Sequence, residues 1–177
     1  ALAVYRGHAP SVPIWSVSSS PSGYYFATAA ADATARIWVT DKPTPVRILS
    51  GHTNASVNAV EWHPNCNYVV TGCDDKTVRM WDVQSGHCVR LLTGGSCGIN
   101  VVAVSPSGQF CSGADYAGVI HVWDLGSGKK VNEYRPPANL KRDRSGISNA
   151  SMINSLCYSP CGSALAAGGD DCVVRIW

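Results

Sequence analysis

The chain has 177 residues, the size of one ordinary domain, and 45% of them are hydrophobic. With 15% charged residues and a net charge of +2, the composition excludes a disordered chain and gives no support for direct nucleic acid binding. No apolar stretch approaches the roughly 20 residues of a transmembrane helix, so we expect no membrane contact.

The eight cysteines follow neither a disulfide nor a zinc pattern. The nearest two, Cys157 and Cys161, are four residues apart, and most of the others lie within apolar runs. The chain starts with ALAVYRGHAP, which lacks the features of a secretory signal. We expect buried, reduced thiols in an intracellular protein, with no metal and no cofactor.

The first unit of the chain, residues 7–50, begins with Gly7-His8. A strand IWSVSS is followed by the turn SPSG at 20–23, and the stretch DATARIW ends at Trp38. The second unit, residues 51–93, repeats this order with Gly51-His52, VNAVEW, HPNC at 63–66 and DKTVRMW. Its further runs, YVVTG and HCVRLLTG, bring the unit to four short strands.

The third unit, residues 94–135, has INVVAV, then SPSG at 105–108, then AGVIHVW. The fourth, residues 136–177, has INSLCY, then SPCG at 159–162, then DCVVRIW. The tryptophans that end these stretches are spaced by 43, 42 and 54 residues. The longer last spacing places an insertion at 135–151.

Four strands in about 43 residues predict an all-β fold built from propeller blades. The Gly-His start, the Asp six residues before a Trp, and the Trp-Asp end resemble the WD40 repeat family. The resemblance implies a WD40 β-propeller with four blades of four-stranded antiparallel sheet, part of a seven-bladed ring. It also implies that the last strand of each unit joins the neighbouring blade, that residues 3–6 form such an outer strand, and that the chain stops after the third strand of its final unit.

The resemblance also implies a structural hydrogen-bond network in each blade. Its expected members are His8, Thr28, Asp32 and Trp38, then His52, Thr71, Asp75 and Trp81, then Ser112 and Trp123, then Asp171 and Trp177. The indole N–H of Trp donates a hydrogen bond, imidazoles and hydroxyls can both donate and accept one, and a carboxylate accepts one. These side chains can therefore satisfy one another's hydrogen bonds. Imidazole, hydroxyl and carboxylate are also the groups of a catalytic triad. Because the set occurs in more than one unit, we expect no catalytic residue and no enzyme.

Partner contacts are expected at two places. The second position of each first strand reads Trp15, Asn58, Asn100 and Asn154, which predicts a polar ring with one aromatic anchor at one mouth of the central channel. The alternative is that the Asn side chains satisfy neighbouring loop backbone. The insertion carries Lys141, Arg142 and Arg144, which could dock an acidic partner, and Ser145, which could be phosphorylated. Its alternative is a tolerated insertion without function.

A finer resemblance rests on GYYF, PVRILSGH, HPNCNYVVTG and DKTVRMWDVQSGHCVRLLTG. These stretches resemble the WD40 domain of the TFIID subunit 5 family of TBP-associated factors, best over residues 5–94. The resemblance implies a nuclear, non-enzymatic scaffold of TFIID or SAGA-type complexes with histone-fold subunits as partners. The alternative is a WD40 adaptor of another pathway, such as ubiquitin-ligase substrate recognition or signalling, with a cytoplasmic location.

Four repeats leave a seven-bladed ring incomplete. We expect a segment of a longer chain. The alternatives are that four units close on themselves or that copies assemble into a homo-oligomer, because an open blade face would expose apolar surface.

Overall fold

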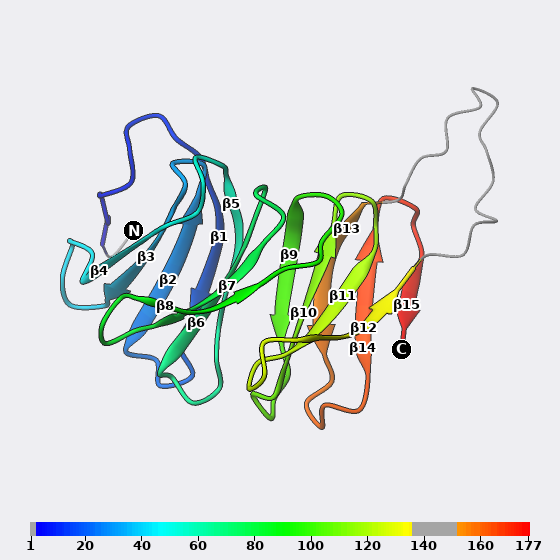
Figure 1. The fold of residues 1–177 in the computed structure, drawn as a ribbon. Coiled ribbons are helices and arrows are strands. Elements are labelled where there is room, and N and C mark those ends of the chain that lie inside the picture. The colour runs from blue at the N-terminus through cyan, green and yellow to red at the C-terminus, as the bar shows by residue number, and fades with distance from the viewer. Residues whose placement is uncertain (1–2, 136–151) are drawn as a thin grey trace.

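The structure, a computed structural model, describes residues 3–135 and 152–177. Within these ranges it contains fifteen strands and no helix. The strands form four antiparallel sheets that lie side by side, with the first and last sheets at opposite ends of the row (Figure 1). Lys141, Arg142, Arg144 and Ser145 lie outside the described residues, so the expected role of the insertion stays a prediction.

Each sheet follows the chain order of its strands. The first contains β1 (Ile14–Ser19), β2 (Tyr25–Ala30), β3 (Thr34–Val39) and β4 (Arg47–Ser50). The second contains β5 (Val57–Trp62), β6 (Tyr68–Cys73), β7 (Val78–Asp82) and β8 (Cys88–Leu92), and the third contains β9 (Ile99–Val104), β10 (Phe110–Asp115), β11 (Ile120–Asp124) and β12 (Lys130–Tyr134). The fourth contains β13 (Ile153–Tyr158), β14 (Leu165–Gly169) and β15 (Val174–Ile176).

The turn after each inner strand has the same chemistry in all four sheets. In each, a backbone hydrogen bond closes a four-residue turn with proline at its second position, as from Gly23 N to Ser20 O at 2.9 Å and from Cys66 N to His63 O at 2.9 Å. The fourth residue has a positive φ, which suits glycine. Cys66 adopts the same left-handed conformation, with φ of 62°. The repeated SPSG-type marker is therefore the signal for this turn.

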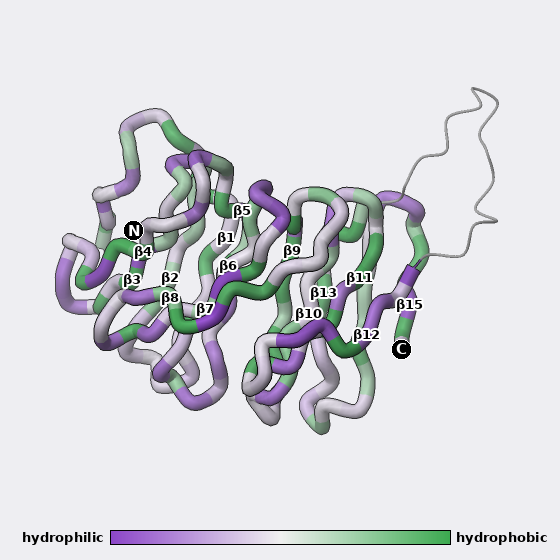
Figure 2. The backbone as a smooth tube through the Cα atoms, viewed as in Figure 1, coloured by the Kyte–Doolittle hydropathy of each residue, from purple (hydrophilic) through white to green (hydrophobic). Residues whose placement is uncertain are grey.

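The sheets pack face to face through three apolar clusters. The inner strands β1, β5, β9 and β13 are successive neighbours. The first two sheets bury Ile37, Leu49 and Trp62 between them, and comparable clusters lie at the two other interfaces. Hydrophobic residues gather on the strands, whereas the loops at their ends are mostly hydrophilic (Figure 2). The four sheets are therefore blades of a β-propeller, and the expected fold class is confirmed.

Two details of the expected blades are wrong. β4 pairs with β3, so the last strand of residues 7–50 completes its own blade and not the neighbouring one. Residues 3–6 form no strand and join none of the four sheets. The ring of Tyr5 instead packs edge-on against Phe26 and Trp38.

The fourth blade has three strands and not four. This agrees with the expectation that the chain stops after the third strand of its final unit. Its last strand exposes Val174 and Ile176.

All eight cysteines are free thiols within the described ranges. Cys73 and Cys111 are buried as expected, whereas Cys88, Cys157, Cys161 and Cys172 are exposed, which corrects the expectation of buried thiols. Nowhere in the described chain is there a helix long and apolar enough to cross a membrane.

Candidate partner-binding site at the channel mouth

The four side chains at the second position of the inner strands line one cavity of about 570 Å³. The cavity, here named the channel-mouth cavity, is bounded by Trp15, Ser16, Ala31, Ser56, Asn58, Ala59, Asp74, Asn100, Val101, Tyr116, Met152 and Asn154. It lies where β1, β5, β9 and β13 begin. The structure thus brings together Trp15 and the three asparagines that the sequence pattern singled out.

Side chains of this ring connect each blade to the next. Asn58 Nδ2 donates to the carbonyl of Ile99 at 3.0 Å, and Asn100 Nδ2 donates to the carbonyl of Ile153 at 2.8 Å. Trp15 Nε1 donates to Ser56 Oγ at 2.8 Å, which carries the same link from the first blade to the second. Asn58 and Asn100 therefore satisfy backbone of the neighbouring blade, as the alternative interpretation expected, while the ring also lines a cavity.

Two asparagines also bond a carboxylate of their own blade. Asn58 Nδ2 donates to Asp74 Oδ1 at 2.6 Å, and Asn154 Nδ2 donates to Asp170 Oδ1. Both aspartates directly precede a network position, Asp75 or Asp171, so the Asp-Asp doublet recurs in the second and fourth units. Sequence reasoning missed Asp74 and Asp170, although the recurring doublet was a usable signal.

Tyr116 completes the polar wall of the cavity. Its hydroxyl accepts a hydrogen bond from Asn58 Nδ2 at 3.1 Å. Burial and the hydrogen bond with Asp74 raise the pKa of Tyr116 to about 12, so the hydroxyl stays protonated and donates to the carboxylate. Sequence reasoning missed this residue as well, because only the fold brings it beside the doublet.

Gly98 allows these groups to approach one another. A Cβ at this position would lie 2.9 Å from Asp74 Oδ1 and 2.9 Å from Tyr116 Cε2, closer than van der Waals contact permits. The backbone N–H of Tyr116 donates to the carbonyl of Gly98 at 3.1 Å and holds the two loops together. A glycine is therefore required here by the geometry of the cavity wall.

The expected four-residue networks of the first two blades form continuous hydrogen-bond chains. In the second blade Trp81 Nε1 donates to Thr71 Oγ1 at 2.8 Å, Thr71 Oγ1 lies 2.8 Å from His52 Nε2, and His52 Nδ1 lies 2.8 Å from Asp75 Oδ2. A carboxylate only accepts, so His52 donates through Nδ1 and accepts the Thr71 hydroxyl through Nε2. In the first blade Trp38, Thr28, His8 and Asp32 repeat the arrangement with distances of 2.9, 2.7 and 2.9 Å.

The environment fixes the charge states of this network. Burial favours the neutral form of Asp75, but hydrogen bonds from Thr77 and His52 outweigh it and lower its pKa to about 2. Burial lowers the pKa of His52 below its usual 6.5 against the opposing effect of Asp75, which favours the neutral imidazole that the chain of bonds requires.

His52, Asp75 and the thiol of Cys73 are also a potential metal-binding group, since their ligand atoms lie within 4.8 Å of one another. Both nitrogens of His52 are already hydrogen-bonded. Burial raises the pKa of Cys73 to about 12, which keeps the thiol protonated in the metal-free protein. The chemistry of this donor set therefore favours the hydrogen-bond network over an ion.

The third blade has a network at shifted positions. Asp115, which is buried, accepts hydrogen bonds from Ser96 Oγ at 2.9 Å and His121 Nε2 at 3.1 Å. Backbone N–H groups of the following turn also bond its other oxygen. Burial opposes ionisation, but these bonds lower the pKa of Asp115 to about 2. Sequence reasoning missed this set because Asp115 lies eight residues before Trp123 instead of six.

Ser112 and Trp123 are not joined as the sequence pattern predicted. Trp123 Nε1 donates to the carbonyl of Thr93 at 2.9 Å, and Ser112 Oγ bonds the hydroxyl of Tyr158 in the fourth blade. With Gly95 in place of the histidine, no imidazole is available to fix the Ser112 hydroxyl.

In the fourth blade, Asp171 forms an ion pair with Arg175 and accepts a hydrogen bond from Val173 N at 3.2 Å. The ring of Trp177 lies 5.5 Å from that of Tyr134 in the third blade, measured between centroids. The two predicted residues of this unit therefore serve a turn and a blade interface respectively.

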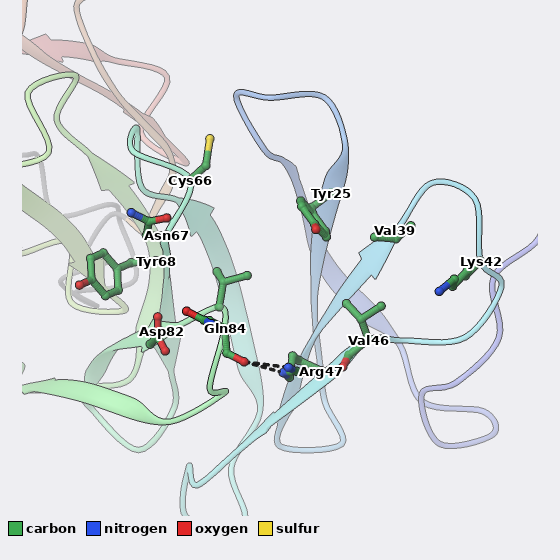
Figure 3. Close-up of a pocket in the computed structure, with 11 residues that line it drawn as sticks. Tyr25, Val39, Lys42, Val46, Arg47, Cys66, Asn67, Tyr68, Asp82 and Gln84 are labelled. Atoms are coloured by element: carbon green, nitrogen blue, oxygen red, sulfur yellow. Dashed lines mark hydrogen bonds between the residues drawn. The ribbon is translucent and has the colours of Figure 1, made fainter.

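A second cavity, of about 710 Å³, lies between the first two blades at the opposite ends of their strands. Arg47 of β4 spans it, and its Nε and Nη2 donate to the carbonyl of Gln84 at 3.0 and 2.8 Å (Figure 3). Between the second and third blades, His63 Nε2 lies 2.9 Å from the carbonyl of Gly108. Ser20 stands at the position of His63 in the first blade.

The amino-acid sequence is also similar to a known family and to known proteins. The family model described as "WD domain, G-beta repeat" matches residues 1–39, 43–82, 86–124 and 143–177. The chain is 43% identical over 122 residues to "Transcription initiation factor TFIID subunit 5" of Caenorhabditis elegans, which covers 69% of this chain and 18% of that protein.

Over shorter stretches, the chain is similar in sequence to plant proteins. It is 33% identical over 79 residues to "Small ribosomal subunit protein RACK1" of Glycine max and 34% identical over 79 residues to "Small ribosomal subunit protein RACK1z" of Oryza sativa subsp. japonica. Each match covers 45% of this chain and 20% of the relative. The chain thus spans a fifth or less of the length of these curated relatives.

Proposed function

Since the chain belongs to the family of WD40 repeat proteins, which are protein-interaction scaffolds, we propose that it is the WD40 part of a TFIID- or SAGA-type transcription factor subunit. The observation that carries the proposal is the 43% identity to TFIID subunit 5, which extends over 122 residues. The protein would support assembly of the transcription pre-initiation complex without catalysing a reaction.

The hydrogen bonding of the triad-like groups supports a scaffold over an enzyme. A nucleophilic hydroxyl needs a free path to its substrate and a base ready to take its proton. Thr71 is fully buried and already accepts a bond from Trp81, and the same arrangement recurs in the first blade. These groups stabilise the blades instead of forming one reactive centre.

The proposed partners are the histone-fold subunits of such a complex, and the proposed location is the nucleus. The channel-mouth cavity is the proposed contact surface, because it combines an exposed tryptophan, Trp15, with polar side chains from four blades. The net charge of +2 gives no reason to propose direct contact with DNA. Self-association through the exposed face of the fourth blade stays a prediction.

A second candidate, an adaptor of another pathway, is favoured by the matches to RACK1 of plants. A protein of the small ribosomal subunit would be cytoplasmic. This candidate has weaker support, because the matches are 33–34% identical and cover 45% of the chain, against 43% and 69% for the transcription factor subunit.

The test is affinity purification of the natural full-length protein, tagged at its own locus, followed by quantitative mass spectrometry. We expect TBP-associated factors with histone folds among the most enriched proteins from nuclear extract. Enrichment of small ribosomal subunit proteins without such factors would replace the proposal with the second candidate, and enrichment of ubiquitin-ligase components would favour the general adaptor.

A further inference from the structure

The channel-mouth cavity offers a ligand mainly hydrogen-bond acceptors. The amide groups of Asn58, Asn100 and Asn154 use their Nδ2 donors on carbonyls or carboxylates of the blades. Within the described part of the chain, their Oδ1 atoms receive no hydrogen bond. An amide oxygen only accepts hydrogen bonds, so these oxygens are complementary to a group that donates.

The described residues give the wall of the channel-mouth cavity a negative charge. Among the described residues that bound the cavity, Asp74 is the one charged residue, and none is a lysine or arginine. Its carboxylate is exposed and receives bonds from the side chains of Asn58 and Tyr116, which hold it in place. A carboxylate that is fixed before binding attracts a cation without a further cost of ordering.

Two aromatic side chains, Trp15 and Tyr116, bound the same cavity as this carboxylate. Trp15 is 58% exposed and Tyr116 is 39% exposed, which is unusual for such large rings. The N–H of Trp15 already bonds Ser56, so a ligand would meet the carbon surface of this ring and not its N–H. A π face and a carboxylate in one cavity both favour a positively charged planar group.

We propose that the channel-mouth cavity binds an arginine side chain of a partner protein, with the guanidinium stacked on Trp15 and paired with Asp74. A guanidinium has five N–H donors and no acceptor, so it complements a wall of amide and carboxylate oxygens. The cavity volume of about 570 Å³ also accommodates residues that flank the arginine. The inference rests on the proposed function only in that the partner is a protein.

An anionic or neutral occupant fits these observations less well. A phosphate or acidic side chain would lie beside the carboxylate of Asp74 and find no cation among the described residues that bound the cavity. An aliphatic side chain would leave the oxygens of the asparagines without donors. Charge and hydrogen bonding therefore both select a cation.

The test uses the natural full-length protein and two fluorescein-labelled peptides, Gly-Ser-Arg-Ser-Gly and the same peptide with citrulline in place of arginine. Citrulline keeps the shape of arginine and removes its charge. By fluorescence anisotropy at low salt, the arginine peptide should bind about tenfold more tightly than the citrulline peptide, and added salt should reduce the difference. Equal affinity of the two peptides in the unmodified protein would overturn the proposal.

Two variants locate the effect. Asp74→Asn keeps the shape of the side chain and an acceptor for Asn58, and it should lower the affinity for the arginine peptide to that for citrulline. Trp15→Ala should weaken binding of the arginine peptide about tenfold. The matched controls, Asp41→Asn and Tyr24→Ala, change exposed residues outside the cavity and should bind as the unmodified protein does.

An equal loss of affinity in Asp41→Asn and Asp74→Asn would contradict the assigned site. The two proposals fail separately. If TFIID subunits copurify but the peptides do not differ, the arginine site alone is wrong. If the peptides differ but ribosomal proteins copurify, the proposed complex alone is wrong.

Discussion

At the scale of single residues, buried aspartates hold the blades together. Asp32 and Asp75 each accept bonds from a histidine, a threonine side chain and backbone N–H groups, although their side chains are nearly inaccessible to water. A buried carboxylate is favourable only when such donors replace its hydration. The network is therefore a condition of the fold at these positions.

Replacement of Asp75 by alanine should lower the free energy of unfolding by roughly 1–3 kcal/mol, because it leaves His52 Nδ1 and the Thr77 hydroxyl without their acceptor. Urea unfolding of the natural protein measures the change. Asp41→Ala is the matched control, since Asp41 is exposed in the loop after β3. A variant at Asp75 that unfolds at the same urea concentration as this control would refute the structural role.

The free energy of unfolding should decrease in two steps as pH is lowered. The pKa values of Asp32, Asp75 and Asp115 are lowered from 3.8 to about 2 in the folded protein, so the unfolded chain binds more protons between these values. Their contribution is present above about pH 4 and is lost as pH falls toward about 2. His52 has a folded pKa below 6.5, so a smaller loss begins as pH falls through 6.5.

Urea midpoints recorded from neutral pH down to about pH 2 check this dependence. The steepest loss should lie below about pH 4. A midpoint that is constant or rises over this acidic range would show that the aspartates are not stabilised by their donors in the folded state.

At the scale of strands and blades, small residues allow the sheets to approach. A Cβ at Gly72 of β6 would lie 2.8 Å from Ile99 Cγ2 and 2.8 Å from Val102 Cγ1 of the next blade. Gly168 occupies the equivalent position of β14, where a Cβ would meet nothing within 4 Å. The same residue type thus has different roles in an interior blade and in the last described one.

Gly72→Ala should lower the free energy of unfolding by roughly 1–3 kcal/mol, because the methyl group overpacks the interface of the second and third blades. Gly168→Ala, the matched control, should be neutral or slightly stabilising, since alanine restricts the unfolded chain and has room in the fold. Thermal or urea unfolding of both variants checks this. Equal effects would mean that the blades are not packed as described.

The sequence predicted elements well where a local signal recurs. The turns at 20–23, 63–66, 105–108 and 159–162 and the inner strands before them were predictable from proline, glycine and alternation. The pairing of β4 with β3 and the lack of a strand at 3–6 were not, because strand partners depend on free edges elsewhere in the fold.

The candidate site divides in the same way. Trp15 and the asparagines share one register position, so their alignment predicted a common location. Asp74 and Tyr116 reach the cavity through different loops. Asp115 and His121 form a network whose distance in sequence from Trp123 differs from that of the other units. Such groups come together only through tertiary packing, which periodicity in the sequence does not encode.

At the scale of the whole molecule, repeated links between blades create one continuous surface. Arg47 bonds the carbonyl of Gln84 in the next blade, and Arg90 Nη2 lies 3.3 Å from the carbonyl of Gly126 in the blade after that. At the other end of the strands, the asparagine ring makes the corresponding connections. A surface fixed at both ends suits a scaffold, because it binds a partner without first having to be ordered.

We propose that this scaffold belongs to a TBP-containing transcription complex. The decisive experiment is gradient sedimentation of nuclear and cytoplasmic extracts, with detection of the natural protein, TBP and small ribosomal subunits in every fraction. We expect the protein to sediment with TBP in nuclear fractions, and depletion of TBP should remove it from them. Sedimentation with small ribosomal subunits, unchanged by depletion of TBP, would contradict it.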